Sequence, residues 1–382
     1  MSCVDPILSY TQSRQADIIG LIRRLVECES PSDNRAAVDG FVDLVADTVS
    51  PLAKVKTHRG GKYGKLLECR MNLPGKRKQG RILALGHSDT VWPLGTLRAM
   101  PFRQAEGRLW GPGVLDMKSG IAFFIFAARA LRELEIPVGA EVVLQLNPDE
   151  EVGSPQSRQL TEANARRSRA VLVLEPGTGL DGKLKTARKG VGEYIVEVSG
   201  KASHAGVDFA AGASAVVEMA RQIERIAGFT DLKRGITVNA GVVSGGSRPN
   251  VVAAQARTLV DIRVPRSGDA PRLDKKFRAL RPFDKRCTIE VTGGMNRPPL
   301  ERTAGVVALF RQAQKLGREL GMELEESSTG GGSDGNFTAA LGVPTLDGIG
   351  AVGEGAHAAH ESILVDRTAG RTALIAKLLA SV

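Results

Sequence analysis

The chain has 382 residues, a formal net charge of +10 and a hydrophobic fraction of 42%. This length suits two domains with a buried core. No apolar run approaches the roughly 20 residues of a membrane span, and the N-terminus does not have the pattern of a signal peptide, so we expect neither. The four cysteines, Cys3, Cys28, Cys69 and Cys287, show no paired or zinc-knuckle spacing. We therefore expect a reducing, cytoplasmic setting.

The basic net charge alone fits either nucleic acid or small acidic substrates as partners. The densest basic run, GKRKQGR at 75–81, has no interleaved aromatic residues and precedes a predicted strand. We interpret this run as a solvated turn. Since no nucleic-acid-binding motif accompanies it, we expect small-molecule substrates and neither a nucleic-acid nor a membrane partner.

The first 190 residues alternate between helical and strand patterns. Helices are predicted over 15–28, 36–52, 119–134 and 154–167, and apolar strands over 81–86, 141–147 and 170–175. Strands of this kind between helices predict an α/β fold with a mixed, mostly parallel sheet that helices cover on both faces. Catalytic groups in such sheets gather at the carboxyl ends of the strands.

The pattern changes near residue 191. Strands are predicted over 192–200, 236–246, 253–264 and 287–294, and helices over 211–228 and 271–280. This βαββαβ order is typical of a small ferredoxin-like α+β domain. Because patterns of the first kind resume afterwards, we predict a first domain in two parts, 1–190 and 297–382, with a second domain inserted at 191–296.

Polar side chains follow the predicted strands of the first domain or lie in polar, glycine-rich motifs. Two examples are GHSDTV at 86–91 and NPDEEVGS at 147–154. The candidate residues are His87, Asp89, Asp116, Glu150, Glu151, Glu175 and His357.

Each candidate has a simpler explanation when taken alone. Asp116 could be the N-cap of the helix that follows it. Asp89 and Glu175 could be turn carboxylates, and His87 could be a hydrogen-bonded histidine of the core. As a set, imidazoles and carboxylates without cysteine suit zinc or a similar divalent ion. Because they are too many for one tetrahedral ion, they suit two ions that share a bridging carboxylate.

The sequence resembles a known family, the co-catalytic dizinc metallopeptidases that include bacterial glutamate carboxypeptidase, aminoacylase, tripeptidase and succinyl-diaminopimelate desuccinylase. The resemblance spans nearly the whole chain in the family's order. It implies that 1–190 and 297–382 form the catalytic domain and that 191–296 is a lid or dimerisation domain. GKASHAG and LEPG are most similar to the glutamate carboxypeptidase branch. The matching stretches are GHSDTVWP, GPGVLDMKSG, DEEVGSPQSR, LEPG, TARKGVGEYIVEVSGKASHAG, GGGSDGNFTAALGVPTLDG and GAHAAHES.

The resemblance implies a metal site with two Zn2+ ions, for which Co2+ or Mn2+ are candidate substitutes. His87 and Glu175 would bind one ion, and Glu151 and His357 would bind the other. Asp116 would bridge both ions.

The resemblance also implies catalytic roles. Asp89 would orient His87, and Glu150 would be the general base that moves a proton from water to the leaving amine. His204 in the inserted domain would reach the active site of a partner subunit and donate to the oxyanion, with Asn250 beside it. His204 alone could also be a surface loop histidine.

The resemblance assigns the substrate carboxylate to Arg263, Gly331 and Gly332, with Arg297 as a weaker candidate. Arg263 could instead be an exposed strand residue. The segment after His357 departs from the family pattern, and we interpret the extra His360 there as a rim residue. Glu361 occupies a position that is often acidic in the family.

The function implied is a zinc-dependent exopeptidase or amidohydrolase that cleaves the amide bond to a C-terminal amino acid with a free carboxylate, with glutamate favoured, and that forms a homodimer. An N-acyl-amino-acid deacylase and a dipeptidase are the alternatives within the family. A non-catalytic metal-binding relative is the alternative outside this class of enzyme, although such a protein would not need Glu150.

Overall fold

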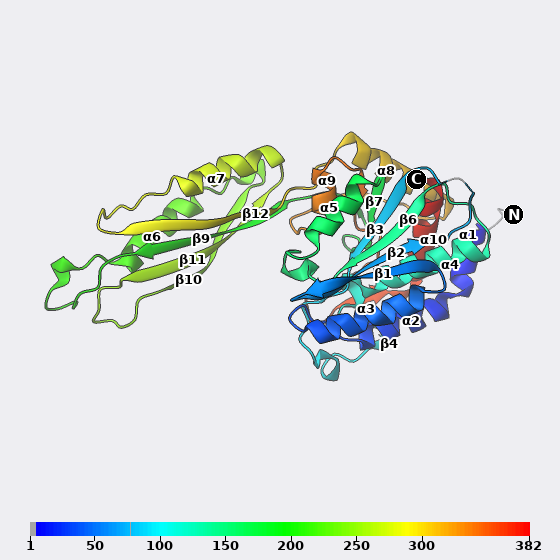
Figure 1. The fold of residues 1–382 in the computed structure, drawn as a ribbon, viewed down its shortest axis with the longest axis horizontal. Coiled ribbons are helices and arrows are strands. Elements are labelled where there is room, and N and C mark those ends of the chain that lie inside the picture. Colours follow the sequence, from blue (N-terminus) through cyan, green and yellow to red (C-terminus); the bar gives the residue numbers. More distant parts are fainter. Residues whose placement is uncertain (1–4, 77) are drawn as a thin grey trace. The chain divides into compact units, whose positions relative to one another are not determined.

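The computed structural model describes residues 5–76 and 78–382, so Cys3 and Arg77 lie outside the described part of the chain. The chain forms two compact units, each described by itself below (Figure 1). The first unit comprises Met1–Ala187, Arg302–Ser328 and Ser333–Val382, and the second comprises Arg188–Glu301 and Thr329–Gly332. The short segment Thr329–Gly332, which the sequence analysis left in the first domain, therefore belongs with the second unit.

A mixed six-stranded sheet forms the centre of the first unit (Figure 1). Its strand order is β1-β2-β6-β3-β7-β14, and the pairs from β6 to β14 are parallel. β1 and β2 form an antiparallel hairpin at one edge. The strands are β1 (Ala53–Gly61), β2 (Gly64–Met71), β3 (Arg81–His87), β6 (Glu141–Asn147), β7 (Ala170–Val173) and β14 (Thr345–Leu346).

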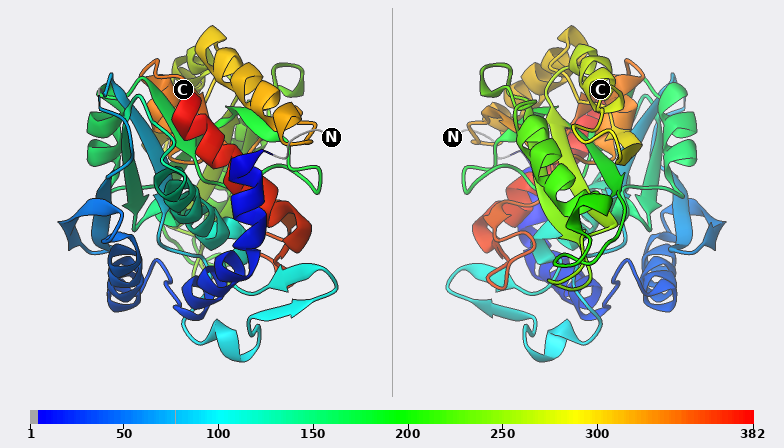
Figure 2. Two further views of the ribbon diagram at one scale, coloured as in Figure 1. Left: turned by 90° about the vertical axis from the view of Figure 1, so that its right-hand side faces the viewer. Right: turned by 90° about the vertical axis from the view of Figure 1, so that its left-hand side faces the viewer.

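Helices cover both faces of this sheet, with α4 and α10 on one face and α5 and α9 on the other (Figures 1 and 2). The side chains of β3 alternate accordingly: Ile82 and Ala84 join the larger hydrophobic core, and Leu83 and Leu85 join the smaller one. The predicted fold class is confirmed. The helices are α1 (Pro6–Ser13), α2 (Gln15–Glu27), α3 (Arg35–Val49), α4 (Ser119–Glu133), α5 (Arg158–Arg166), α8 (Ala304–Glu319), α9 (Gly335–Ala340) and α10 (Val365–Ser381).

Helix α4 is buried on nearly every side, because it packs between the sheet and the helices α2 and α10. Every residue from Ser119 to Ala128 is buried, and this part of the sequence, SGIAFFIFAA, carries no charge, as a helix buried on all sides requires. The Ser119 hydroxyl donates a hydrogen bond to the carbonyl oxygen of Val114 over 2.5 Å. This rigid helix fixes the loop that precedes it, which contains Asp116.

Two smaller sheets complete the first unit. One has the order β15-β16-β5-β4, and the loop between its first two strands contains His357. The other pairs β8 with β13. No helix in the described part of the chain is both long and apolar enough to cross a membrane. The strands are β4 (Arg103–Ala105), β5 (Arg108–Trp110), β8 (Leu184–Arg188), β13 (Glu326–Thr329), β15 (Gly353–Glu354) and β16 (Ser362–Leu364).

The second unit is a four-stranded antiparallel sheet with two helices on one face (Figure 1). Its chain order is βαββαβ and its strand order is β10-β11-β9-β12, which confirms the predicted ferredoxin-like domain. Tyr194 and Phe277 stack at its core with ring centroids 3.9 Å apart. The elements are β9 (Gly190–Ser199), α6 (Ala215–Ala227), β10 (Thr237–Gly245), β11 (Gln255–Val264), α7 (Ala270–Arg278) and β12 (Thr288–Arg297).

Candidate metal centre

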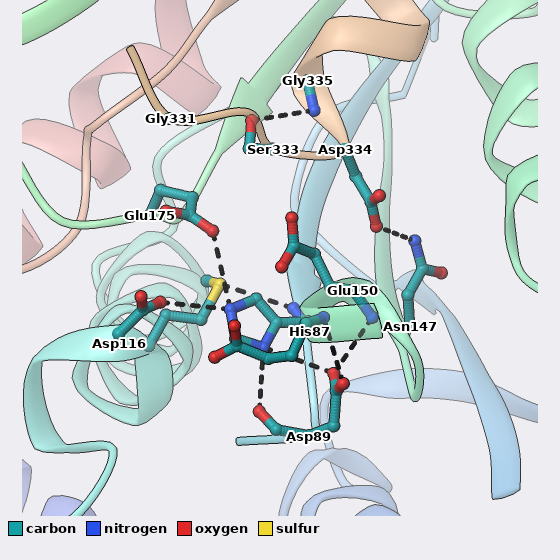
Figure 3. A network of polar contacts seen from close by, with 12 residues as sticks. His87, Asp89, Asp116, Asn147, Glu150, Glu175, Gly331, Ser333, Asp334 and Gly335 are labelled. Atoms are coloured by element: carbon teal, nitrogen blue, oxygen red, sulfur yellow. Dashed lines mark hydrogen bonds and ion pairs between the residues drawn. The ribbon is translucent and has the colours of Figure 1, made fainter. Parts of the chain in front are cut away.

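His87 is the last residue of β3 and is almost fully buried. Its Nδ1 lies 2.9 Å from the carbonyl oxygen of Asp89 and 3.5 Å from the Asp89 carboxylate. Because Nδ1 donates to these oxygens, Nε2 is available on the other side of the ring. There it lies 3.2 Å from Asp116 Oδ1 and 3.5 Å from Glu175 Oε1, so the imidazole is surrounded by carboxylates (Figure 3).

Asp116 connects the two predicted histidine ligands. Its Oδ1 lies 3.2 Å from His87 Nε2, and its Oδ2 lies 3.4 Å from His357 Nε2. The same His357 nitrogen lies 3.4 Å from Glu151 Oε2. One carboxylate therefore directs one oxygen to each imidazole, and each imidazole has a second carboxylate beside it.

Besides orienting His87, Asp89 holds a second part of this centre in place. Its carboxylate accepts hydrogen bonds from the backbone N–H groups of Glu150 and Glu151, each over 3.2 Å. It also accepts one from the Ser32 hydroxyl over 2.8 Å. Asp89 therefore anchors the loop after β6, in which Glu150–Val152 form one turn of 3-10 helix. The sequence analysis did not find this second role, because backbone donors leave no residue pattern.

The donor set of the centre fits a divalent cation. His87 shares one cluster of potential ligand atoms with Glu150 and Glu175 and another with Asp116 and Glu151, each within 4.8 Å. The Oε1 atom of Glu151 is buried and has no hydrogen-bond partner in the described part of the chain. A buried carboxylate oxygen without a donor is costly, and a cation would compensate for it.

The charges of the centre also favour a cation. Hydrogen bonds to Asp116 and then Glu151 raise the pKa of His357 to about 10. Burial opposes the charge of His87, but hydrogen bonds to Asp116, Asp89 and Glu175 raise its pKa well above its ordinary value. Burial raises the pKa of Glu151. Without a metal ion, the centre therefore holds protons on its histidines to balance its carboxylates.

Glu361 is a buried carboxylate beside the centre, and the sequence analysis missed its structural role. It is 1% exposed, whereas the sequence suggested only an acidic residue near the metal loop. Its carboxylate accepts hydrogen bonds from the backbone N–H groups of Gly113, Leu115 and Asp116 over 2.8–3.1 Å and from the Trp92 indole over 2.8 Å. It therefore fixes the backbone of the loop that contains Asp116.

The second unit contains His204 and Asn250, both with exposed side chains. The N–H groups of Gly206 and Val207 donate to His204 Nδ1, each over 3.1 Å. In the neutral ring the proton is therefore on Nε2, which is a potential donor. The carbonyl oxygen of Asn250 accepts from the N–H of Ala205 over 3.0 Å, so the two predicted residues lie on neighbouring segments.

Arg263 lies on β11, and its guanidinium binds Asp261 through Nε and a terminal nitrogen over 2.8–3.1 Å. Its charge is therefore already balanced by a carboxylate of the same strand. Gly331 and Gly332 belong to the short segment of the second unit, and their carbonyl oxygens accept from Arg188, a residue that the sequence analysis did not select. Arg297 is 5% exposed at the end of β12.

His360 is exposed and packs against the backbone of Gly355, where φ is +82°. It belongs to none of the potential ligand clusters of the described residues. The structure thus brings together His87, Asp89, Asp116, Glu150 and Glu175 in the first unit (Figure 3). Glu151 and His357 of the same unit lie beside Asp116. In contrast, His204, Asn250, Arg263, Gly331 and Gly332 belong to the second unit.

An α/β fold that gathers the histidine and carboxylate donors of a divalent-cation site at its strand ends and neighbouring loops is typical of metal-dependent hydrolases. The model of peptidase family M20/M25/M40 matches residues 83–381. The chain belongs to this family.

Relatives and solved structures agree with this assignment. The chain is 31% identical over 293 residues to carboxypeptidase G2 of Pseudomonas sp., covering 75% of this chain and 70% of that protein. It is 27% identical to the succinyl-diaminopimelate desuccinylase of Paracoccus denitrificans, covering 91% of this chain and 93% of the relative. Its fold is similar to that of a tripeptidase from Staphylococcus aureus, with a TM-score of 0.78, 20% identity, and coverage of 96% of this chain and 98% of that one.

Proposed function

We propose that the protein is a dizinc hydrolase that cleaves the amide bond to a C-terminal amino acid with a free carboxylate, with glutamate favoured. Co2+ or Mn2+ are candidate substitutes for Zn2+. The observation that carries this proposal is Asp116, whose two oxygens lie 3.2 Å from His87 Nε2 and 3.4 Å from His357 Nε2. A carboxylate between two imidazoles suits a bridging ligand of a two-metal site. The similarity to carboxypeptidase G2 supports the substrate class.

In this proposal the residues of the first unit divide between binding and proton transfer. His87 and Glu175 would hold one ion, Glu151 and His357 would hold the other, and Asp116 would be shared between them. Bound ions would polarise the scissile carbonyl and acidify water. Glu150 takes a proton from the attacking water and passes it to the leaving nitrogen. The hydrogen bond from its N–H to Asp89 keeps its backbone in place for this transfer.

The second unit supplies the remaining groups in this proposal. The Nε2–H of His204 donates to the oxyanion of the transition state at the site of a partner subunit, with Asn250 beside it. Arg263, Gly331 and Gly332 hold the substrate carboxylate. For Arg263 this requires the substrate to share or replace Asp261, because that carboxylate binds the guanidinium in the free protein.

A homodimer through the second unit is part of the proposal. β10 is an edge strand of the four-stranded sheet, and unpaired edge strands are available for pairing. Val242 and Val243 on this strand are 55% and 60% exposed, and Val216 and Val217 on α6 are 42% and 52% exposed. Exposed valines along an edge strand and a helix support an interface between two copies.

We also propose a reducing compartment such as the cytoplasm. Cys28, Cys69 and Cys287 are all free thiols, and two of them are buried. Buried free cysteines are typical of proteins kept under reducing conditions.

A second candidate function is N-acyl-amino-acid deacylation, which the similarity to the desuccinylase favours, and a dipeptidase is the third. A screen of N-acyl amino acids and dipeptides with added Zn2+ tests all three. We expect release of free glutamate from N-acyl-glutamates and loss of turnover after chelation of the metal. No hydrolysis of any substrate by a protein that binds zinc would indicate a non-catalytic relative instead.

A further inference from the structure

A cleft of about 440 Å³ opens beside the metal centre within the first unit. The ligand Glu151 and its neighbour Val152 line one side, so a group bound in the cleft lies next to the reacting bond. Clefts of this volume are ordinary sites for small molecules. The cleft therefore has the place and size to receive one end of a substrate.

The walls of this cleft are largely apolar. Val91 and Val152 are 42% and 45% exposed, although valine is usually buried, and Tyr63 and Pro93 lie beside them. The charged side chains that line it in the described part of the chain, besides Glu151, are Lys62 and Asp33, which have opposite signs. Such a cleft suits an uncharged apolar group better than an ion.

The tip of the β1–β2 hairpin is held beside the metal loop by Gln156. The Oε1 atom of Gln156 accepts from the N–H of Gly61 over 2.8 Å and from that of Tyr63 over 3.4 Å, and its Nε2 donates to the carbonyl oxygen of Gly64 over 2.7 Å. The N–H of Gln156 donates to Asp149, the residue before Glu150. The position of Tyr63 is therefore fixed relative to the catalytic loop.

Nothing in this cleft is suited to the free carboxylate of an amino acid. Its one cationic group in the described residues, Lys62, is an exposed ammonium on a flexible side chain, 5.1 Å from the centre of the Tyr63 ring. A carboxylate is held best by a bidentate guanidinium or by several N–H donors. The cleft therefore suits the other half of the substrate, the acyl side of the scissile bond.

We propose that this cleft is the acyl-side subsite of the enzyme, that it takes an uncharged apolar acyl group, and that Tyr63 is its specificity-determining residue. This inference rests on the proposed function, because a substrate has an acyl side only if the enzyme cleaves its amide bond. Contact with the apolar wall stabilises each buried methylene of the acyl group. A charged acyl group gains little, because Lys62 and Asp33 offset each other.

The test compares three substrates that share glutamate as the leaving group and differ in the acyl group: N-acetyl-, N-hexanoyl- and N-succinyl-glutamate. We expect the zinc-loaded enzyme to prefer the hexanoyl substrate. Tyr63→Ala is expected to lower kcat/KM for the hexanoyl substrate about tenfold more than for the acetyl substrate. Tyr63→Phe keeps the ring and is expected to restore the preference. Lys54→Ala, at an exposed lysine near the other end of β1, is the control.

A binding measurement separates this inference from the proposed function. Isothermal titration of N-hexanoyl-glutamate into Glu150→Gln is expected to show binding that Tyr63→Ala weakens about tenfold. If the enzyme cleaves none of the substrates but this loss is seen, the proposed function fails, while the binding of an apolar group by the cleft and by Tyr63 stands. The subsite assignment is overturned if Tyr63→Ala lowers kcat/KM equally for all three substrates or leaves it unchanged for all of them. It is also overturned if the wild-type enzyme prefers the succinyl substrate.

Discussion

At the scale of the residue, two adjacent glutamates have different environments in the same turn. Glu151 has one oxygen 3.4 Å from His357 and the other buried without a donor in the described residues. Glu150 also lies within ligand distance of His87 and Glu175, so distance alone does not separate base from ligand. The contact between His357 and Glu151 supports ligation by Glu151, which leaves Glu150 for proton transfer.

We predict that Glu150→Gln retains both metal ions, because Glu150 is assigned to proton transfer and not to ligation. Turnover is expected to fall by a factor on the order of 10²–10⁴, because the amide cannot take the proton from water. Glu151→Gln is expected to lose metal. The test is to measure the zinc content per subunit by elemental mass spectrometry, and kcat by a hydrolysis assay, for both variants. A Glu150→Gln protein without zinc beside an active Glu151→Gln protein would reverse the two roles.

The raised pKa of His357, about 10, predicts proton release on metal binding. In the metal-free protein at pH 7 this imidazole is charged, because the pH lies below its pKa, and a ligand imidazole must be neutral. We therefore expect zinc binding to release protons and its apparent affinity to rise with pH. The number of protons that zinc binding releases from His357 should decline as the pH rises through about 10, because the imidazole is then already neutral.

The measurement is calorimetry of zinc binding at pH 7 in buffers of different ionisation enthalpy. His357→Gln should release about one proton fewer. His360→Gln, at an exposed histidine three residues along the chain, is the matched control. Equal release from the wild type and the His357→Gln variant would contradict this assignment of the proton.

At the scale of the element, much of the centre follows from the sequence. The apolar strands ending at His87 and Asn147 predict where His87, Asp89 and the two glutamates meet. The sequence did not predict the β1–β2 hairpin, because β1 is an edge strand with many exposed polar residues and no apolar run. It also missed the role of Glu361, whose partners lie about 245 to 270 positions earlier in the chain.

Glu361 provides a prediction for the loop before α4. Glu361→Gln removes the negative charge that binds three backbone N–H groups and the Trp92 indole. We expect about 10- to 100-fold weaker zinc binding in a protein that still folds. Glu354→Gln, which removes the charge of an ion pair with Arg108 in the same small sheet, is the control. Unchanged zinc affinity in Glu361→Gln, measured by competition with a chelator, would remove this positioning role.

At the scale of the whole molecule, the two predicted groups of site residues belong to different units. The metal ligands lie in the first unit, and His204 and Asn250 lie in the second. The sequence predicts the order of these segments along the chain. It does not predict whether His204 serves its own subunit or a partner, because that depends on a dimer interface. The surfaces that pair edge strands between subunits leave no local sequence pattern.

Mixed subunits test the role of His204 in a partner site. Glu150→Gln and His204→Ala should each be nearly inactive alone. After subunit exchange, a heterodimer has one site with an intact Glu150 and a donated His204, so we expect activity to return to as much as about one quarter of the wild-type value per subunit, since half of a statistical mixture is heterodimeric with one competent site each. Exchange should be verified with a labelled subunit. No recovery after proven exchange, or a fully active monomer in sedimentation, would contradict the role.

The short segment Thr329–Gly332 means that the second unit is not one continuous stretch of chain. Arg188 donates to the carbonyl oxygens of Gly331 and Gly332, and the N–H of Lys189 donates to that of Thr329 over 3.0 Å. A second unit transplanted between relatives as the single segment 188–301 would leave these acceptors behind. Exchange of this unit, in the laboratory or in evolution, therefore requires two pieces of sequence to be inherited together.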